Sequence, residues 1–220
     1  RLTGGWVPSS TSADSELSEG LRTLRDRSRA LIRDASYAKR ARTVVVNNVI
    51  GQGIGLQAQV RTSRDEFNDR VNDDIERVWE RWCQADSCHT GGRLHFGDFE
   101  RSLMSEVFSA GDVFVRIHRR PFGHSSIPFA LEIIESERIC DDASVPSVPQ
   151  GRNLRMGVET DEFHRPVAYY VRQAHRNDVR WSGGSEKVER VQATDIIHLA
   201  VIDRWPQTRG EPWLHTALRR

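Results

Sequence analysis

Four residues with metal-binding character lie close together in the chain: Cys83, Cys88, His89 and His95. Thiol and imidazole groups are the usual ligands of structural zinc, which takes them in close pairs. The spacing Cys83-x4-Cys88 is just compatible with one such pair, but no second pair follows at a regular distance. Cys83 also falls at the end of an amphipathic pattern, where a buried thiol is common. We therefore expect no bound metal and no cofactor.

Two further groups of residues could support catalysis. Acidic side chains cluster between residues 132 and 142, as they would in a nuclease that uses two metal ions. His198 stands in an apolar run and could act as a general base beside a nucleophile. However, the sequence contains no Gly-x-Ser-x-Gly turn and no partner carboxylates at a readable spacing. We expect no enzyme, and a metal-dependent nuclease around Glu135, Glu137 and Asp141 stays as an alternative.

Positive charge is concentrated in one stretch, although the net charge of the 220 residues is +1. Apolar residues between 21 and 42 recur at spacings of three and four, which predicts a long amphipathic helix. Its other faces are rich in arginine, including Arg22, Arg25, Arg29 and Arg33. Two interpretations remain open. In the first, the face is solvated and meets acidic groups elsewhere, in the same chain or on a neighbouring subunit. In the second, it contacts the backbone of a nucleic acid.

The elements that must position these residues are helices first and strands afterwards. Residues 1–20 are rich in Ser, Thr and Gly and predict a flexible arm. After the first helix, residues 43–60 indicate an extended chain that is bent at its glycines. Helices are expected at 65–83 and 98–109, and strands at 113–120, 129–137, 154–160, 166–175 and 195–201. This order predicts an α+β fold with a mostly antiparallel β region.

The expected organisation is a helical part at about 21–110, a β-rich part at about 111–202 and a junction at about 203–220. The helix at 65–83 should bury Phe67, Val71, Ile75, either Val78 or Trp79, and Trp82. The apolar runs are too short for a transmembrane helix, so we expect no membrane partner. Three cysteines fit a reducing compartment better than a disulfide scaffold. The chain lacks an initiator methionine and ends soon after a new helix begins, so it is read as a fragment.

Five stretches resemble segments of lambda-type phage portal proteins, in unbroken order between residues 21 and 220. They are SYAKRARTVVVNNVIGQGIGLQAQ, VWERWCQADSCHTGGRLHFGDFERSLMSEVFSAGDVFVRI, LEIIESERI, MGVETDEFHRPVAYYV and IIHLAVIDRWPQTRGEPWL. The last is the most distinctive. It contains a His (His198), then an Arg three residues before a Gln (Arg204 and Gln207), and then Arg-Gly-x-Pro-Trp at residues 209–213. The chain departs from the family at His164, where Gly is usual, and at Trp205-Pro206, where Pro-Gly is commoner. Both departures fall in turns.

The resemblance implies that the segment from residue 203 onward joins the outer wing of a portal subunit to the helices that line a channel. The junction residues are Arg204, Gln207, Arg209, Gly210, Pro212 and Trp213. The two arginines and the glutamine should brace the junction, within one subunit or across to the next. Gly210 should supply a positive φ angle, and Pro212 should begin the following helix, with Trp213 on its apolar face.

The resemblance also implies a function. Portal subunits form a closed ring, commonly dodecameric, at one vertex of the capsid, and double-stranded DNA is packaged and ejected through it. Expected partners are other copies of the chain, the terminase, capsid or scaffold proteins, and head-completion proteins. The protein would belong to the virion, and to the host cytoplasm during assembly. The DNA-contacting residues should lie beyond Arg220. The alternative is a nucleic-acid-binding protein that uses the basic helix at 21–42.

Overall fold

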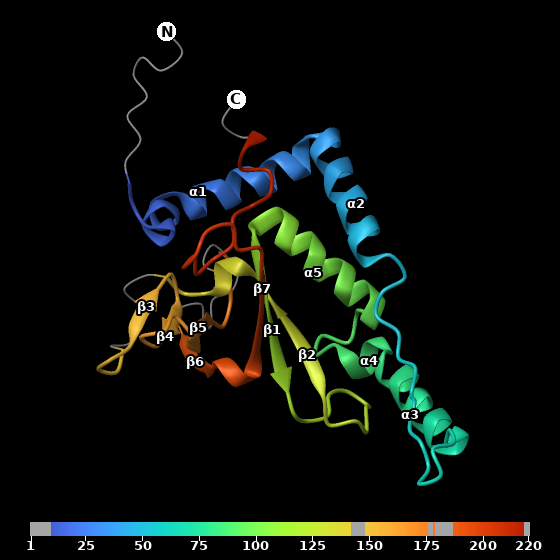
Figure 1. The fold of residues 1–220 in the computed structure, drawn as a ribbon. Helices are drawn as coiled ribbons and strands as arrows, with labels where there is room; N and C mark the ends of the chain where they lie inside the picture. Colours follow the sequence, from blue (N-terminus) through green and yellow to red (C-terminus); the bar gives the residue numbers. More distant parts are fainter. Residues whose placement is uncertain (1–9, 142–147, 176–177, 179–186, 218–220) are drawn as a thin grey trace.

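The computed structural model describes residues 10–141, 148–175, 178 and 187–217, and helices precede strands along the chain (Figure 1). The helices are α1 (Ala13–Asp34), α2 (Ser36–Ile50), α3 (Asp69–Trp82), α4 (Ala85–Cys88) and α5 (Phe96–Ala110). The strands are β1 (Asp112–His118), β2 (Ala130–Ile134), β3 (Asn153–Arg155), β4 (Val158–Thr160), β5 (Pro166–Arg172), β6 (Val188–Gln192) and β7 (Ile196–Ala200). The predicted α+β class is confirmed.

The strands form two antiparallel sheets, one in the order β2-β1-β7 and one in the order β3-β4-β5-β6. The short 3-10 helix η1 (Ser136–Arg138) follows β2, and the short 3-10 helix η2 (Ala193–Asp195) precedes β7. Apolar residues of both sheets share one core cluster: Phe114, Ile134, Ile139, Val158, Tyr169, Val171, Val191 and Ile196. The polar hairpin expected around Gly183 and Gly184 lies outside the described residues.

Helix α5 joins the sheet layer to the helical layer. One side of α5 contributes Phe99 to a cluster with Val115 of β1 and Leu131 of β2, and this cluster also holds Trp82. Its other side contributes Phe108 to a cluster with Ile32 of α1 and Ala38 of α2. Both clusters are buried, so α5 is the central helix of the described chain.

The first two helices differ from the sequence prediction. Helix α1 begins at Ala13, capped by Ser12, whose Oγ accepts a hydrogen bond from Ser15 N at 3.2 Å, so residues 13–20 are helical instead of part of an arm. Residues 1–9 lie outside the described residues. The long helix is broken at Ala35, which has extended backbone angles. Helix α2 then continues through residues 43–50, which were expected to be extended, and ends at Gly51. Packing of α2 against α5 outweighs the strand preference of the valines.

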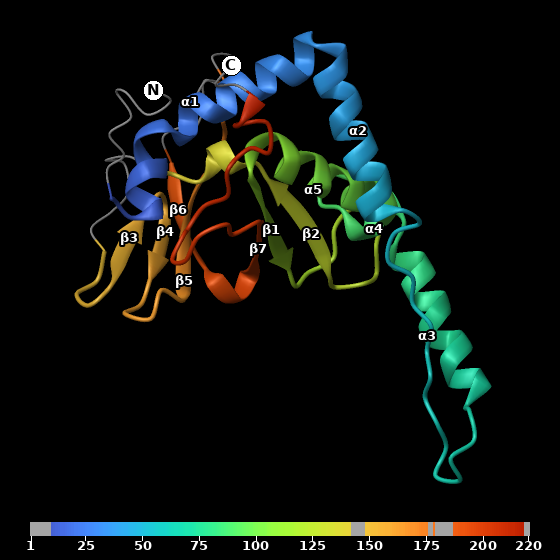
Figure 2. The ribbon, with the colours of Figure 1, turned by 45° about the horizontal axis from the view of Figure 1, so that its top comes forward.

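Residues 51–82 form a projecting arm, in which an extended segment leads outward from α2 and α3 returns alongside it to the body (Figure 2). Ala58 N donates to Glu76 Oε1 at 2.9 Å, and Val60 N donates to Asn72 Oδ1 at 2.8 Å. The predicted buried face of α3 is largely exposed, because Val71, Ile75 and Val78 are 37%, 38% and 51% exposed. Phe67, on the same expected face, is 52% exposed. Trp82, at the base of the arm, is the member of that face that is buried, at 7%.

Across the described ranges, no helix is both long enough and apolar enough to cross a membrane.

Candidate functional site: the junction around Asp112

The segment 203–213 follows β7 and runs beside α1 and the top of α5 (Figure 1). It carries all six residues predicted to form a junction. Arg209 is the most deeply buried of its charged residues, at 1% exposure, and Gln207 is 6% exposed. At its far end Trp213 N donates to Phe108 O of α5 at 3.1 Å. The middle of the segment, residues 206–212, is thus largely covered by other parts of the same chain, while residues 203–205 and 213 are exposed.

Asp112, the first residue of β1, is the centre of this junction and is completely buried. Arg209 Nε donates to its Oδ2 at 2.6 Å, and Arg25 Nη2 of α1 donates to its Oδ1 at 2.9 Å. The backbone N of Gly210 donates to Oδ2 at 3.1 Å, and Ser136 Oγ donates to Oδ1 at 2.5 Å. A single carboxylate therefore joins α1, β1, η1 and the junction segment.

The electrostatics of Asp112 follow from these partners. Burial alone would raise the pKa of its carboxyl, but the charges of Arg209 and Arg25 and a hydrogen bond with His198 lower this pKa well below the ordinary 3.8. Burial lowers the pKa of Arg25 to about 10, so its guanidinium stays charged at neutral pH. The site is a paired and fully hydrogen-bonded ion cluster, the form in which buried charges are stable.

Arg209 satisfies its remaining donors on two carbonyl groups. Its Nη1 donates to Met156 O at 2.9 Å and its Nη2 to Ser136 O at 3.0 Å. Its guanidinium also lies over the ring of Phe114, 5.0 Å from the centroid. The planar fork of arginine can serve a carboxylate and two carbonyls at once, which a lysine cannot do. Arg209 thus ties the junction to both sheets.

Gly210 is required for a reason that differs from the prediction. Its φ angle is not among the positive ones, so it does not supply a left-handed backbone conformation. A Cβ at this position would instead meet Gly111 O at 2.0 Å, because the two backbones cross in close contact. Pro212 begins no α-helix within the described residues. Residues 213–216 form turns, His215 N donates to Pro212 O, and residue 217 is in a 3-10 conformation.

An outer layer of contacts ties the start of α1 to the junction. Asp14 accepts hydrogen bonds from Thr208 N and Thr208 Oγ1, both at 2.7 Å, and from Arg155 Nη1 at 2.9 Å. Arg204 Nη2 donates to Thr11 O at 2.7 Å. Gln207 Nε2 donates to Arg209 O at 2.8 Å, which shapes the turn internally. Arg204, Gln207 and Arg209 thus all have hydrogen-bond partners within their own chain.

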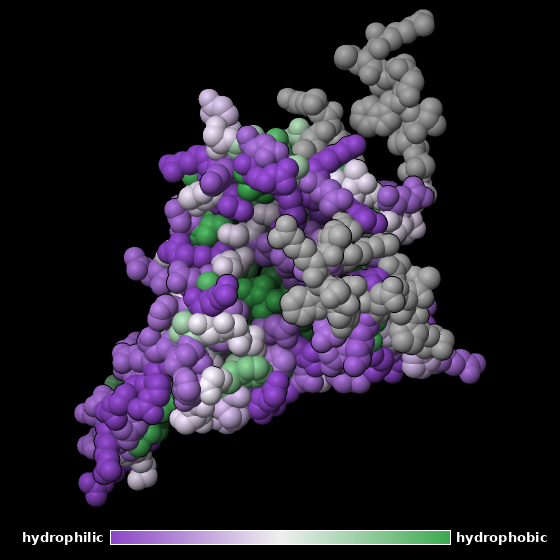
Figure 3. Space-filling model, turned by 180° about the vertical axis from the view of Figure 1, so that it is seen from behind, coloured by the Kyte–Doolittle hydropathy of each residue, from purple (hydrophilic) through white to green (hydrophobic). Residues whose placement is uncertain are grey.

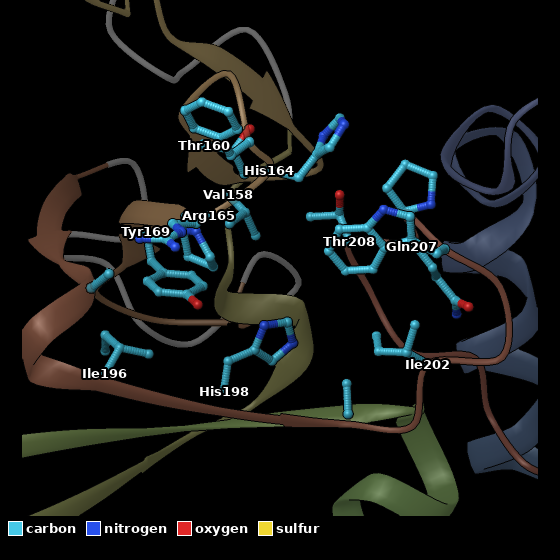
Figure 4. Close-up of a pocket in the computed structure, with 16 residues that line it drawn as sticks. Val158, Thr160, His164, Arg165, Tyr169, Ile196, His198, Ile202, Gln207 and Thr208 are labelled. Atoms are coloured by element: carbon cyan, nitrogen blue, oxygen red, sulfur yellow. The ribbon is translucent and has the colours of Figure 1, made fainter.

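A cleft of about 630 Å³ lies beside the junction, between β7 and the turn that joins β4 to β5 (Figure 4). Tyr169, His198 and Gln207 are among the residues that line it. Two positions that depart from the portal pattern, His164 and Trp205, meet here. Their rings are arranged edge to face, with 6.1 Å between the ring centroids. His164 has a φ of 63°, a backbone conformation that glycine adopts more easily. His198 stacks on Phe114 and lies 3.4 Å from Asp112, so it belongs to the ion cluster.

The arginines of α1 do not form a continuous basic face. Arg25 is buried against Asp112, which removes it from any surface contact with nucleic acid. Arg29 donates to Glu106 and Glu137, at distances of 2.6 to 3.2 Å, and is also engaged within the chain. Arg22 and Arg33 are exposed, and Arg33 pairs with Asp34. The acidic groups expected to meet this helix are therefore found, for two of the four arginines, in the same chain.

Two residues that were considered for catalysis or metal binding, Glu137 and Cys88, are engaged in contacts within the chain. Glu137 is committed to Arg29, and although burial raises its pKa, the hydrogen bonds and charge of Arg29 lower it overall. Cys88 Sγ donates to Leu94 O at 3.4 Å, and burial raises the pKa of its thiol to about 11. Within the described part of the chain, no group of three His, Cys, Asp or Glu residues could hold a metal ion. Asp142 lies outside that part.

Comparisons with known proteins identify a family for this chain. The family model described as phage portal protein, lambda family, matches residues 1–220. A relative from Halomonas phage phiHAP-1 (isolate -/Gulf of Mexico/-/2001), named probable portal protein, is 30% identical over 220 residues, which cover 98% of this chain. The same alignment covers 42% of that relative, so the chain spans less than half of its length.

The sequence prediction named six residues of the segment 203–213, but it did not include two residues that the structure brings into contact with them. Asp14 lies within residues 1–20, which were expected to form a flexible arm, and Asp112 directly precedes the strand predicted at 113–120. The signal available for Asp112 was a carboxylate at the start of an apolar strand, where a charge requires a buried partner.

Proposed function

Because the chain belongs to the lambda family of phage portal proteins, we propose that it is the wing portion of a portal subunit. Such subunits assemble into a closed ring at one capsid vertex, through which double-stranded DNA is packaged and ejected. The family is structural and not catalytic. The proposed partners are further copies of the chain, commonly twelve in all, the terminase, and capsid and head-completion proteins. The proposed location is the virion, with assembly in the host cytoplasm.

The observation that carries this proposal is the family match along residues 1–220. The junction geometry supports it, because the segment 203–213 leaves the sheets through a buried ion cluster and not through a loose linker. A subunit that transmits load between a peripheral wing and a central channel requires a connection of this kind. The near-neutral chain is also suitable, since tight binding to phosphates would hinder the movement of DNA.

The test is electron microscopy of the full-length product of the gene, together with its mass in solution. We expect closed rings with a central opening wide enough for a DNA duplex. Particles that package or retain DNA should contain this protein at a single vertex. A monodisperse monomer that binds DNA with a steep dependence on salt concentration would contradict the proposal and favour the nucleic-acid-binding alternative through α1.

A further inference from the structure

The arm carries an apolar stripe that the described chain leaves exposed. The face of α3 that carries Asn72 and Glu76 lies against the extended segment 54–61. These two side chains accept hydrogen bonds from backbone N–H groups of that segment. Val71, Ile75 and Val78 recur at spacings of four and three on a neighbouring face, about a quarter turn away. Hydrophobic residues are visible along the arm among hydrophilic ones (lower left of Figure 3). An apolar stripe at helical spacing is the usual form of a helix that binds in a groove.

The body of the same chain contains an apolar groove that α5 covers from one side. The groove has a volume of about 540 Å³ and runs between α5 and β7. Its walls include Phe99, Leu103 and Val107 of α5 and Ile197 and Leu199 of β7. Strand β7 is an edge strand, and Ile197 and Leu199 are 44% and 37% exposed. The groove, which Ile50 and Ile54 also line, is therefore bordered by an exposed edge strand beside α5.

The dimensions of the two surfaces correspond. The wall residues of α5 extend from Phe96 to Val107, which corresponds to about 16 Å of helix. The stripe from Val71 to Val78 corresponds to about 10 Å of helix, so it fits within the length of the groove. Exposed apolar patches of this kind mark interaction sites in soluble proteins.

The Val71, Ile75 and Val78 stripe is held away from the groove of its own chain, although Ile54 near the base of the arm lines that groove. Trp82 is buried in the cluster with Phe99, and its Nε1 donates to Phe129 O at 2.8 Å. From this fixed base α3 leads away from the body (Figure 2). The projecting surface and the recessed surface therefore require different molecules.

We propose that the Val71, Ile75 and Val78 stripe of one copy occupies the groove between α5 and β7 of the next copy. The inference rests on the ring proposed above. A ring of more than two subunits needs a heterologous interface, in which each copy offers two different, complementary surfaces. A projecting apolar helix and a recessed apolar groove on one chain are such a pair. The rest of the full-length protein, or a different phage protein, would be the competing occupant.

Disulfide trapping tests the contact directly in the full-length protein. The variant carries Val78→Cys and Leu199→Cys, with Cys83→Ser to remove a partly exposed native thiol. Mild oxidation should yield a ladder of covalent multimers on a denaturing gel, and a reductant should return it to monomer. The matched control carries Asp73→Cys with Leu199→Cys. Asp73 lies on the opposite side of α3, and this variant should give no ladder.

Charge insertion gives a second measurement. Ile75→Asp and Leu199→Asp should each reduce the amount of assembled ring by on the order of tenfold or more, because each would bury a charge in an apolar contact. Asp73→Arg, at an exposed position, should assemble like the wild type. Circular dichroism of the isolated subunits should show that all three variants fold.

The outcomes separate this inference from the proposed function. Absence of rings from the wild-type protein contradicts both. Wild-type rings that survive Ile75→Asp and Leu199→Asp, without any ladder from the cysteine pair, contradict this contact and leave the portal function standing. A bridge formed inside a single chain also overturns the contact, as it would place the arm in its own groove.

Discussion

The junction and the arm use similar residues in opposite ways. In the junction, Arg209 and Asp112 are buried and satisfied by partners of the same chain. In the arm, polar groups such as Asp74 and Arg77 pair at the surface, and the apolar residues stay exposed. The first region is complete within one chain. The second has surfaces that one chain does not cover, as expected for a part that functions in an assembly.

The variant with the largest expected effect disrupts the junction and leaves the arm unchanged. Asp112→Ala removes the shared partner of Arg25 and Arg209 and leaves both charges buried. We expect the free energy of unfolding to fall by about 3 to 5 kcal/mol, the usual effect of an uncompensated buried charge. Urea denaturation of the variant and the wild type measures this difference.

The matched control is Asp74→Ala, which removes a surface ion pair with Arg77 in the arm. Exposed pairs contribute about 0 to 1 kcal/mol, so this variant should unfold close to the wild type. Equal losses for the two variants would contradict the distinction between a buried junction and an exposed arm.

A glycine in each region sharpens the same comparison. At Gly210 an added Cβ would meet Gly111 O at 2.0 Å, which is backbone and cannot move aside cheaply. Gly210→Ala should therefore lower the free energy of unfolding by about 2 to 3 kcal/mol. At Gly55 of the arm an added Cβ meets nothing within 4 Å. Gly55→Ala should be neutral or stabilise by up to about 1 kcal/mol. Thermal or urea unfolding of both variants decides between these expectations.

Acid should weaken the ion pairs made by Asp112 and Glu137. The pKa values of Asp112 and Glu137 are lower in the folded protein than their ordinary 3.8 and 4.5. Their contribution to stability is therefore complete above the ordinary values, and is lost as the pH falls through the lowered ones. Glu137→Gln removes charged hydrogen bonds with Arg29 and should destabilise by about 1 kcal/mol at neutral pH.

The difference between Glu137→Gln and the wild type should shrink at acidic pH, where the wild-type carboxyl is itself protonated. Urea midpoints measured from neutral to acidic pH test this. A difference that stays constant with pH would mean that the charge of Glu137 is not what stabilises its pairing with Arg29.

The sequence was sufficient to predict elements whose pattern and packing agree. Strands β1 and β5 alternate or run apolar, and both are buried in the shared core as expected. The valines of α2 favour a strand by local propensity, yet they are helical because α2 packs on α5. The pattern of α3 predicted its helix correctly but not its burial. Amphipathic spacing identifies a face that needs a partner, and it does not tell whether that partner is in the same chain.

The junction was predictable in its residues but not in its centre. A dense segment of arginine, glutamine, proline and tryptophan indicated a brace. Asp112 lies 97 residues from Arg209 and 87 residues from Arg25 along the chain. No local pattern connects positions so far apart, because their pairing depends on how α1 and β1 are brought together in three dimensions. The close contact of Gly210 with Gly111 is of the same kind.

The smallest expected effect concerns His164, a departure from the family pattern at the edge of the junction cleft. Its φ of 63° is strained for a residue with a Cβ, so His164→Gly should stabilise the chain by about 0.5 to 1 kcal/mol. His164→Ala keeps the strain and removes the ring contact with Trp205, so it should stabilise less than glycine. Thermal unfolding of the two variants separates backbone strain from ring contact. Both variants lack the ring, so equal stabilities for alanine and glycine would mean that the positive φ angle does not strain this turn.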